Sequence, residues 1–213
     1  MEKNIVDFAL EFAKVFFEGE ASGHDYFHTY RVYKNAEMLV NNIPEADKEI
    51  CLLGAILHDV DDDKISPETH KNKDNARKFL RKNNFSQEKI DFLCRIIDDV
   101  SFSEKRTPET IEGKIVQDAD RLDAIGAIGI ARTFAYGGNK GREMYNPDIK
   151  PNLSNSKEQY KNSKSPTINH FYEKLLLLEK MMNTEIAKKI ARQRTVFMEN
   201  FLEEFFAEWK GER

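Results

Sequence analysis

The pair His58-Asp59 follows the apolar run Ile50–Leu57 and offers two metal-binding side chains next to each other. Imidazole nitrogens and carboxylate oxygens both bind divalent ions, and a helix that presents an adjacent His and Asp to a cavity can supply both. Residues of the same types recur upstream, in Gly23–Val32, and downstream, in Asp118–Asp123. The three segments together predict a metal centre built from distant parts of the chain.

Four polar side chains of the upstream region share one face of a predicted helix, because they are spaced by four, three and four residues. They are His24, His28, Arg31 and Asn35. A row of such side chains is an unusual choice for solvation alone. The structural alternative is a capped, hydrogen-bonded histidine pair.

Acidic residues accompany the other two segments. Helical spacing would stack Asp62 on His58, where Asp62 could accept or orient a proton of an attacking water molecule. The alternative is a solvated helix end. Downstream, Asp120 and Asp123 share one face of a helix, whereas Asp118 points nearly opposite to Asp120. A surface cluster of ion pairs is the alternative there.

Composition limits the classes of protein. The 213 residues fit one domain, and 33% charged with 40% apolar residues is an ordinary balance for a globular protein. With 33 basic and 37 acidic side chains the net charge is −4, which disfavours a nucleic-acid polymer as partner. The longest apolar runs have eight residues, too few to span a bilayer, and no signal-peptide pattern opens the chain. With two cysteines expected as reduced thiols, these features predict a cytoplasmic enzyme without membrane contact.

Most of the chain has helical period, and no segment alternates as a strand does. The predicted helices cover residues 5–16, 32–40, 46–60, 69–83, 86–100, 108–123, 124–136 and 184–209. Ser86 is a predicted N-cap, and Gly126 and Gly129 would let another backbone approach closely. We therefore expect an all-α fold, with residues 1–213 forming a single domain.

The segment from residue 137 to 166 breaks this pattern, since it is rich in Gly, Asn, Ser, Lys and Pro and lacks periodicity. Irregular segments of about thirty residues are uncommon inside compact domains and are usually functional or disordered. It carries six basic and three acidic side chains, a local charge of +3. A basic loop suits a phosphorylated substrate, and a solvated surface loop is the alternative. His170, which opens a predicted helix after the loop, either approaches the phosphates or is structural.

The predicted C-terminal helix carries large aromatic side chains along one side, including Phe201, Phe205 and Trp209. These side chains could pack against their own domain or against a second copy of the chain. A homodimer is therefore one of two expectations for this helix.

The order His, His-Asp, Asp resembles the HD superfamily of metal-dependent phosphohydrolases. The similarity is greatest to small bacterial single-domain members, which share Gly-His-Asp, a His three residues further on and then Arg-Val, as in Gly23–Val32. The segments Ile115–Gly126 and Thr167–Leu175 also look like that subgroup. The resemblance covers most of the chain and implies an HD-type helical bundle.

The resemblance also implies four metal ligands, and the context Ala-Asp-Arg-Leu favours Asp120 over Asp118. The implied ligands are His28, His58, Asp59 and Asp120. Two neutral imidazoles and two carboxylates balance a divalent cation, and mixed nitrogen and oxygen donors suit Mn, Fe, Co, Ni or Zn better than Ca. Family members often use Mn, so we expect one Mn ion, with Fe, Co, Ni, Zn and Mg as alternatives. Binuclear members need further His ligands before the final Asp, and only His70 lies in that interval here.

Related nucleotide-cleaving members carry an acidic pair that serves the attacking water, and Asp62 and Asp63 resemble that pair. Those relatives commonly have Glu at the first of the two positions, so the shorter Asp62 is a departure from the pattern. Polar and basic side chains near the ligands could bind the substrate and offset phosphate charge. The candidates are His24, Arg31, Lys34 and Arg121.

The resembling subgroup implies a nucleotide pyrophosphohydrolase that splits a (d)NTP into (d)NMP and pyrophosphate. A 5′-nucleotidase or a cyclic-nucleotide phosphodiesterase is the alternative within the same class. A non-catalytic HD module that senses a nucleotide is the alternative of another class, and a purely structural helical protein is a third. In all but the last, the expected partner is a small phosphorylated molecule.

Overall fold

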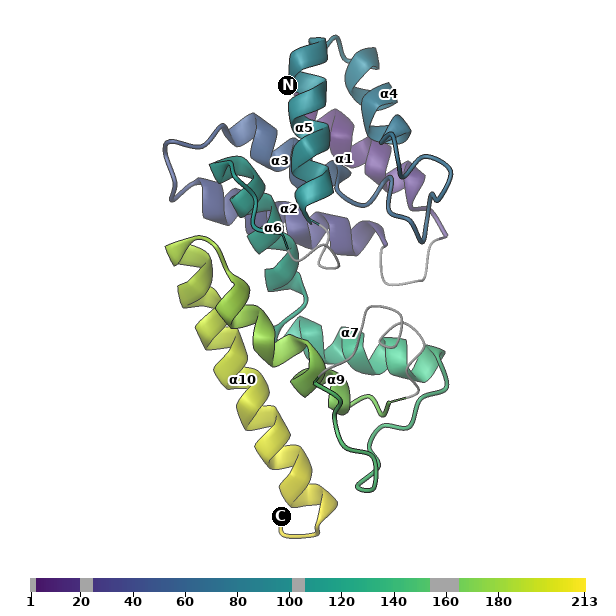
Figure 1. The fold of residues 1–213 in the computed structure, drawn as a ribbon, viewed down its shortest axis with the longest axis vertical. Helices are drawn as coiled ribbons and strands as arrows, with labels where there is room; N and C mark the ends of the chain where they lie inside the picture. The colour runs from purple at the N-terminus through teal and green to yellow at the C-terminus, as the bar shows by residue number, and fades with distance from the viewer. Residues whose placement is uncertain (1–2, 20–24, 101–105, 154–164) are drawn as a thin grey trace. The chain divides into compact units, whose positions relative to one another are not determined.

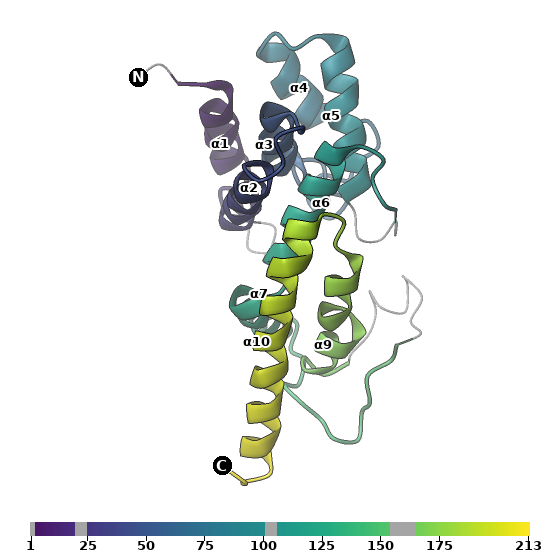
Figure 2. The same ribbon diagram turned by 90° about the vertical axis from the view of Figure 1, so that its left-hand side faces the viewer.

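The structure, a computed structural model, describes residues 3–19, 25–100, 106–153 and 165–213. All regular elements in these ranges are helices, and none of the ranges contains a strand, so the all-α prediction is confirmed (Figures 1 and 2). The chain divides into two compact units, Met1–Asp120 and Arg121–Arg213. A single domain over residues 1–213 stays a prediction.

The first unit is built around a short apolar helix. Its helices are α1 (Ile5–Phe16), α2 (Tyr26–Val40), α3 (Lys48–Leu57), α4 (Asp74–Lys82), α5 (Gln87–Val100) and α6 (Ile111–Asp123), the last of which ends beyond the unit. Helix α3 contacts α1, α2 and α5, and all its residues from Ile50 to Leu57 are buried. A helix that is apolar on every side must lie in the core. The residues that follow α3 therefore begin in the interior of the unit.

The second unit contains α7 (Gly126–Asn139), α9 (Asn169–Glu173), the 3-10 helix η2 (Leu175–Met181) and α10 (Glu185–Trp209). Phe171 is fully buried, and its ring packs against Phe134 and Phe201. Phe205 and Trp209 contact Tyr145, although half of Trp209 stays exposed. The aromatic side of α10 thus has partners within its own unit, and the homodimer stays a prediction.

Two predicted helices end or begin at other residues than expected. The helix predicted for residues 46–60 ends at Leu57, so His58 and Asp62 do not stack through helical spacing. Acidic residues are unfavourable at the negative end of a helix dipole, which explains why the acidic run does not extend α3. The helix predicted for residues 69–83 begins only at Asp74, because Lys73 has left-handed backbone angles (φ 57°, ψ 46°).

The predicted helices 108–123 and 124–136 are separated by a sharp break. Ile125 is extended, and Gly126 has a φ of +78°, which a residue with a side chain adopts only with strain. A Cβ atom on Gly129 would lie 2.3 Å from the carbonyl oxygen of Ala124. The close approach at Gly129 is thus made by the chain five residues before it, and Gly126 is approached by the side chain of Arg194. No backbone of another segment is among the nearest described atoms at either glycine, so that prediction is not confirmed.

Several other boundaries agree with the sequence. Ser86 Oγ accepts a hydrogen bond from the Lys89 amide (3.3 Å), as expected of an N-cap before α5. The segment predicted as irregular is helical as far as Asn139 and then lacks regular structure over residues 140–153. Residues 154–164, which carry three of the six basic side chains of that segment, lie outside the described residues.

Among the helices described, none is long and apolar enough to cross a bilayer.

Candidate metal centre

Two imidazoles and two carboxylates converge within the first unit. Ligand atoms of His28, His58 and Asp120 all lie within 4.8 Å of one another. Asp59 Oδ2 is 3.3 Å from Nε2 of both histidines, and Asp120 Oδ1 is 3.5 Å from Nε2 of His28 and 3.9 Å from that of His58. The His and Asp59 side chains are buried, whereas the Asp120 side chain is 29% exposed. The cluster is therefore enclosed on one side and reachable from solvent on the other.

His28 is positioned by the start of α2. Asp25 is the N-cap of this helix, and its carboxylate accepts a hydrogen bond of 2.7 Å from the backbone N–H of His28. An N-cap fixes the first turn of a helix because it satisfies N–H groups that have no partner within the helix. The imidazole of His28, which is buried, is thereby held at the first turn of α2.

His58 comes directly after α3, and its own ring satisfies a carbonyl group of that helix. Its Nδ1 lies 2.8 Å from the carbonyl oxygen of Ala55. Since a carbonyl can only accept, Nδ1 carries the hydrogen and the neutral ring presents a lone pair at Nε2. This Nε2 is buried and makes no hydrogen bond of good geometry with the residues that the structure describes, although Asp59 Oδ2 is 3.3 Å away. A buried acceptor in this state fits a metal ion as its partner.

The electrostatics of the cluster favour a cation. Burial disfavours the imidazolium form of His58, but Asp59, Asp120 and the Ala55 carbonyl outweigh this effect and raise its pKa from 6.5 to about 9. The same negative groups that stabilise a proton on this ring would stabilise a divalent ion in its place. Nitrogen and carboxylate donors together suit a transition metal better than Ca.

Asp120 is positioned by a contact between two helices. Asn35, a buried residue of α2, donates a hydrogen bond from Nδ2 to the carbonyl oxygen of Ala119 at 3.0 Å. Two residues earlier in α6, the buried Gln117 donates to the carbonyl oxygens of Asp99 (2.6 Å) and Arg106 (2.9 Å). These two amides hold α6 immediately before Asp120. Asp118, the competing ligand, is also buried. Neither Asp118 nor Asp59 belongs to the group His28, His58 and Asp120 found among the described residues, but Asp59 Oδ2 lies 3.3 Å from Nε2 of both histidines.

No sequence pattern distinguishes Asp61 from its two acidic neighbours. Asp61 is buried, and its carboxylate accepts hydrogen bonds from the backbone N–H groups of Asn75 (3.1 Å) and Ala76 (2.9 Å) at the start of α4. Asn75 in turn donates to the carbonyl oxygen of Val60 at 2.9 Å. These bonds hold the chain immediately after the His58-Asp59 pair. No local pattern could reveal them, because the partners lie 14 and 15 residues apart in sequence.

The other predicted site residues of the first unit differ in burial and in their hydrogen-bond partners. The Asp62 carboxylate accepts a hydrogen bond from the Lys64 amide (2.9 Å) in a turn, and Asp63 is exposed. Lys34 is exposed and pairs with Glu37 at 2.5 Å. Arg31 is partly buried, and His24 lies outside the described residues. The catalytic and substrate-binding roles of these residues remain predictions.

Arg121 and His70 contact backbone carbonyl groups, and His170 has a lowered pKa. Arg121, in the second unit, is buried and donates a hydrogen bond to the carbonyl oxygen of Met181. Nδ1 of His70 lies 2.8 Å from the carbonyl oxygen of Asp61, and His70 is not among the clustered metal-binding residues that the described chain contains. Burial, followed by the charges of Lys174 and Arg142, lowers the pKa of His170 to about 3. His170 is therefore neutral at physiological pH.

Comparison with known proteins gives the family. The HD domain model matches residues 25–125, which include His28, His58, Asp59 and Asp120. An HD-superfamily hydrolase from Bacillus thuringiensis has a similar structure, with 41% sequence identity, 96% of each chain covered and a TM-score of 0.75. This chain belongs to the HD superfamily. As an HD-superfamily hydrolase it is a metal-dependent phosphohydrolase, and that part of the sequence-based prediction is confirmed.

Other known proteins are similar to this chain over most of its length. A protein from Lactobacillus plantarum has 36% identity, 99% of each chain covered and a TM-score of 0.85. YpgQ of Bacillus subtilis is 35% identical over 187 residues, which cover 86% of this chain and 83% of YpgQ. The crystal structure of YpgQ in complex with ADP has a TM-score of 0.74 and covers 95% of this chain and 97% of its own.

Proposed function

We propose that this HD-superfamily hydrolase acts on nucleotides and hydrolyses a (d)NTP to (d)NMP and pyrophosphate. The observation that carries the proposal is the convergence of His28, His58, Asp59 and Asp120, with Nε2-to-carboxylate distances of 3.3–3.9 Å. These four residues would hold one divalent ion, for which Mn is our first choice. The ADP complex of the relative YpgQ supports a nucleotide as substrate class.

The proposed roles of the residues in the centre differ according to their burial and charge. A bound divalent ion would polarise a phosphoryl oxygen and lower the pKa of a water molecule. His58 would contribute Nε2 as the ligand atom, because its Nδ1 hydrogen is held by the Ala55 carbonyl. Asp59 lies between the two imidazoles and brings negative charge to the buried side. Asp120, which is partly exposed, lies on the side from which a substrate can enter.

Residues predicted from the sequence would bind the phosphates and move the proton. We assign Asp62, with Asp63 beside it, to orienting water and accepting its proton as the water oxygen attacks the α-phosphorus. The bond from that phosphorus to the bridging oxygen then breaks, and pyrophosphate leaves. His24, Arg31, Lys34 and Arg121 are the candidates that would offset the charge on the phosphates.

Turnover of a panel of (d)NTPs with Mn, Mg, Co and Zn tests the proposal, with phosphate and pyrophosphate quantified separately. The comparison variants are Asp59→Ala in the centre and Glu88→Gln, an exposed acid on α5 that serves as control. We expect pyrophosphate release by the wild type and Glu88→Gln, and none by Asp59→Ala. Release of phosphate alone would reassign the protein as a phosphatase. Bound nucleotide with no turnover under any metal would reassign it as a sensing module.

A further inference from the structure

A strongly basic segment lies outside the metal centre. Residues 71–82 carry six basic side chains and one acidic side chain, a charge of +5 in a chain whose net charge is −4. The segment comprises the turn before α4 and the whole of α4 (Asp74–Lys82). None of the clustered residues His28, His58 and Asp120 belongs to it. Its charge is therefore not explained by the proposed reaction.

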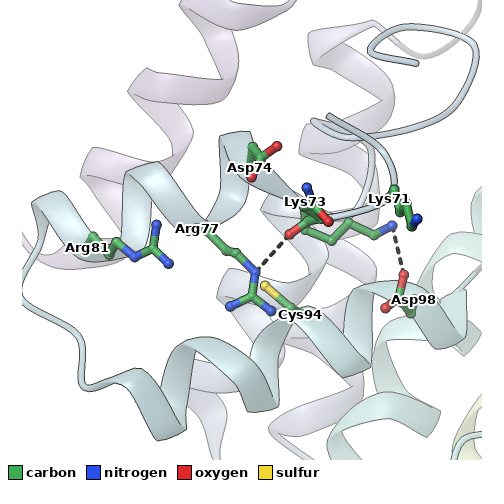
Figure 3. A pocket seen from close by; sticks show the side chains of 8 residues that line it. Lys71, Lys73, Asp74, Arg77, Arg81, Cys94 and Asp98 are labelled. Carbon is green, nitrogen blue, oxygen red and sulfur yellow. Dashed lines mark hydrogen bonds and ion pairs between the residues drawn. The ribbon is translucent and has the colours of Figure 1, made fainter. Parts of the chain in front are cut away.

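Part of this charge lines a pocket in the first unit. The pocket has a volume of about 380 Å³ and is lined by Lys71, Asn72, Lys73, Asp74, Arg77, Arg81, Cys94 and Asp98. Figure 3 shows Lys71 and Arg81 near its two ends, with Arg77 and Cys94 between them. Its lining has four basic and two acidic side chains, so it is net positive. Pockets of roughly 300 Å³ or more accommodate small-molecule ligands.

Two of the four basic side chains are fixed by the protein. Lys73 Nζ is 2.7 Å from Asp98 Oδ1 and 2.6 Å from the carbonyl oxygen of His70, and its side chain is only 6% exposed. Arg77 donates to Asp91 (2.5 Å) and to the carbonyl oxygen of Asn72 (2.8 Å). Such contacts hold the pocket wall in one arrangement before any ligand arrives.

The other two basic side chains have no ion pair with any residue that the structure describes. They are Lys71 and Arg81, both of which are exposed. Arg81 lies four residues after Arg77 and so shares its face of α4. The first-turn N–H groups of α4 are already bonded to Asp61, so side chains and not the helix terminus would hold an anion here.

Cys94 adds no negative charge to the pocket. Burial raises the pKa of its thiol to about 11, so the group stays protonated near neutral pH. A neutral thiol is also a poor metal ligand, because metals bind the thiolate. The pocket is therefore suited to an anion and not to a cation.

We propose that this pocket binds a small phosphorylated anion, at a site separate from the metal centre. Guanidinium groups bind phosphate oxygens through paired N–H donors, and lysine adds a compact positive charge. Arg77 and Arg81 would supply the guanidinium groups and Lys71 the ammonium group. The concave shape favours a small ligand over a polymer, which would contact the exposed basic residues Lys78 and Lys82 as well.

Isothermal titration calorimetry tests this proposal. Inorganic pyrophosphate is titrated into the metal-free full-length protein at two salt concentrations. The pocket variant is Lys71→Gln/Arg81→Gln, and the matched control is Lys78→Gln/Lys82→Gln, which removes the same charge from exposed positions outside the pocket lining. We expect affinity to fall roughly tenfold or more in the pocket variant and less than about twofold in the control, because hydrogen bonds between charged groups are the strong ones. Circular dichroism establishes that both variants are folded.

The remaining outcomes each overturn the proposal. Equal losses in the two variants would mean that pyrophosphate responds to the overall charge of α4. Unchanged binding in the pocket variant, or no binding to the wild type, would place no anion in this pocket. Tighter binding of single-stranded RNA than of pyrophosphate, lost in both variants, would identify a surface for a polymer.

Discussion

Asn35 contacts the backbone of Ala119, the residue that precedes the proposed metal ligand Asp120. Its hydrogen bond to the carbonyl oxygen of Ala119 joins α2, which carries His28, to α6, which carries Asp120. Both helices are thereby held where their ligand side chains meet. The contact is a positioning one, because the Asn35 amide binds a backbone carbonyl beside Asp120 and Asn35 is not one of the four proposed ligands.

We expect Asn35→Ala to weaken Mn binding several-fold and to lower the free energy of unfolding by roughly 1 kcal/mol, as the loss of one buried hydrogen bond does. Titration calorimetry with Mn and denaturant unfolding measure the two effects. Asn42→Ala is the control, because its side chain also donates to a carbonyl group of α2 (Met38, 2.8 Å) but is exposed. Equal Mn affinities in the two variants would contradict a positioning role.

His170 makes the stability of the protein depend on pH. Its pKa is lowered from 6.5 to about 3, so the unfolded chain takes up a proton at a pH at which the folded chain does not. The free energy of unfolding should therefore decrease as the pH falls from about 6.5 towards 3. In His170→Gln this part of the decrease should be absent. Urea unfolding of both proteins at pH 7 and pH 4.5 measures it, and parallel decreases would argue against the histidine as the cause.

At the scale of elements, the start of α4 depends on a residue that lies far from it in sequence. Asp61 receives two N–H groups of the first turn of α4, whereas Lys73, at the N-cap position, makes no side-chain cap. The position of α4 is thus fixed by the segment that follows the His58-Asp59 pair. Loss of these two hydrogen bonds should lower the free energy of unfolding and disturb the metal centre.

Asp61→Ala should lower the free energy of unfolding by about 1–2 kcal/mol, the usual cost of a lost helix cap. The neighbouring Asp63→Ala, at an exposed position, should change it by less than about 0.5 kcal/mol. Urea unfolding of the two variants provides the comparison. Equal free energies of unfolding for Asp61→Ala and Asp63→Ala would show that the hydrogen bonds of Asp61 do not stabilise the protein.

The elements that the sequence predicted well are those with a regular apolar pattern. Helices α1, α5 and α10 begin and end within a residue or so of the expected positions. The start of α4 could not be predicted, because it depends on hydrogen bonds to Asp61, which lies 14 and 15 residues away from its partners. The break before α7 depends on the backbone angles of Ile125 and Gly126, which periodicity does not encode.

The candidate site was predictable for a different reason. His58 and Asp59 are adjacent, and the spacing of the other segments is typical of the HD superfamily, so ligand-type residues could be found without a structure. The residues that support them could not, since Asn35 and Ala119 are 84 residues apart. Only the fold brings such pairs together.

At the scale of the whole molecule, the proposed ligands all lie in the unit Met1–Asp120 and come from three segments of it. An ion bound to α2, α6 and the end of α3 would cross-link these elements. A ligand that binds only the folded state stabilises it by about 2.7 kcal/mol at a hundred times its Kd. The effect should be confined to the elements that carry ligands.

We therefore expect Mn to raise the thermal unfolding temperature and to slow amide hydrogen exchange in α2, α3 and α6. Exchange in α10, which belongs to the other unit, should change little. Exchange measured by mass spectrometry with Mn and after chelation checks this. Slowed exchange in α10 alone would be incompatible with the proposed ligand set.

The location of Asp120 at the last residue of the first unit has a consequence for the order of events during synthesis. His28, His58 and Asp59 leave the ribosome early, and the fourth proposed ligand follows Asp59 after a further 61 residues. At roughly 5–20 residues per second this interval is about 3 to 12 s. During that time the nascent chain would hold three of the four proposed ligands, and the centre would close only when α6 has been made. Metal uptake by the complete centre would thus be a late step in the maturation of this protein.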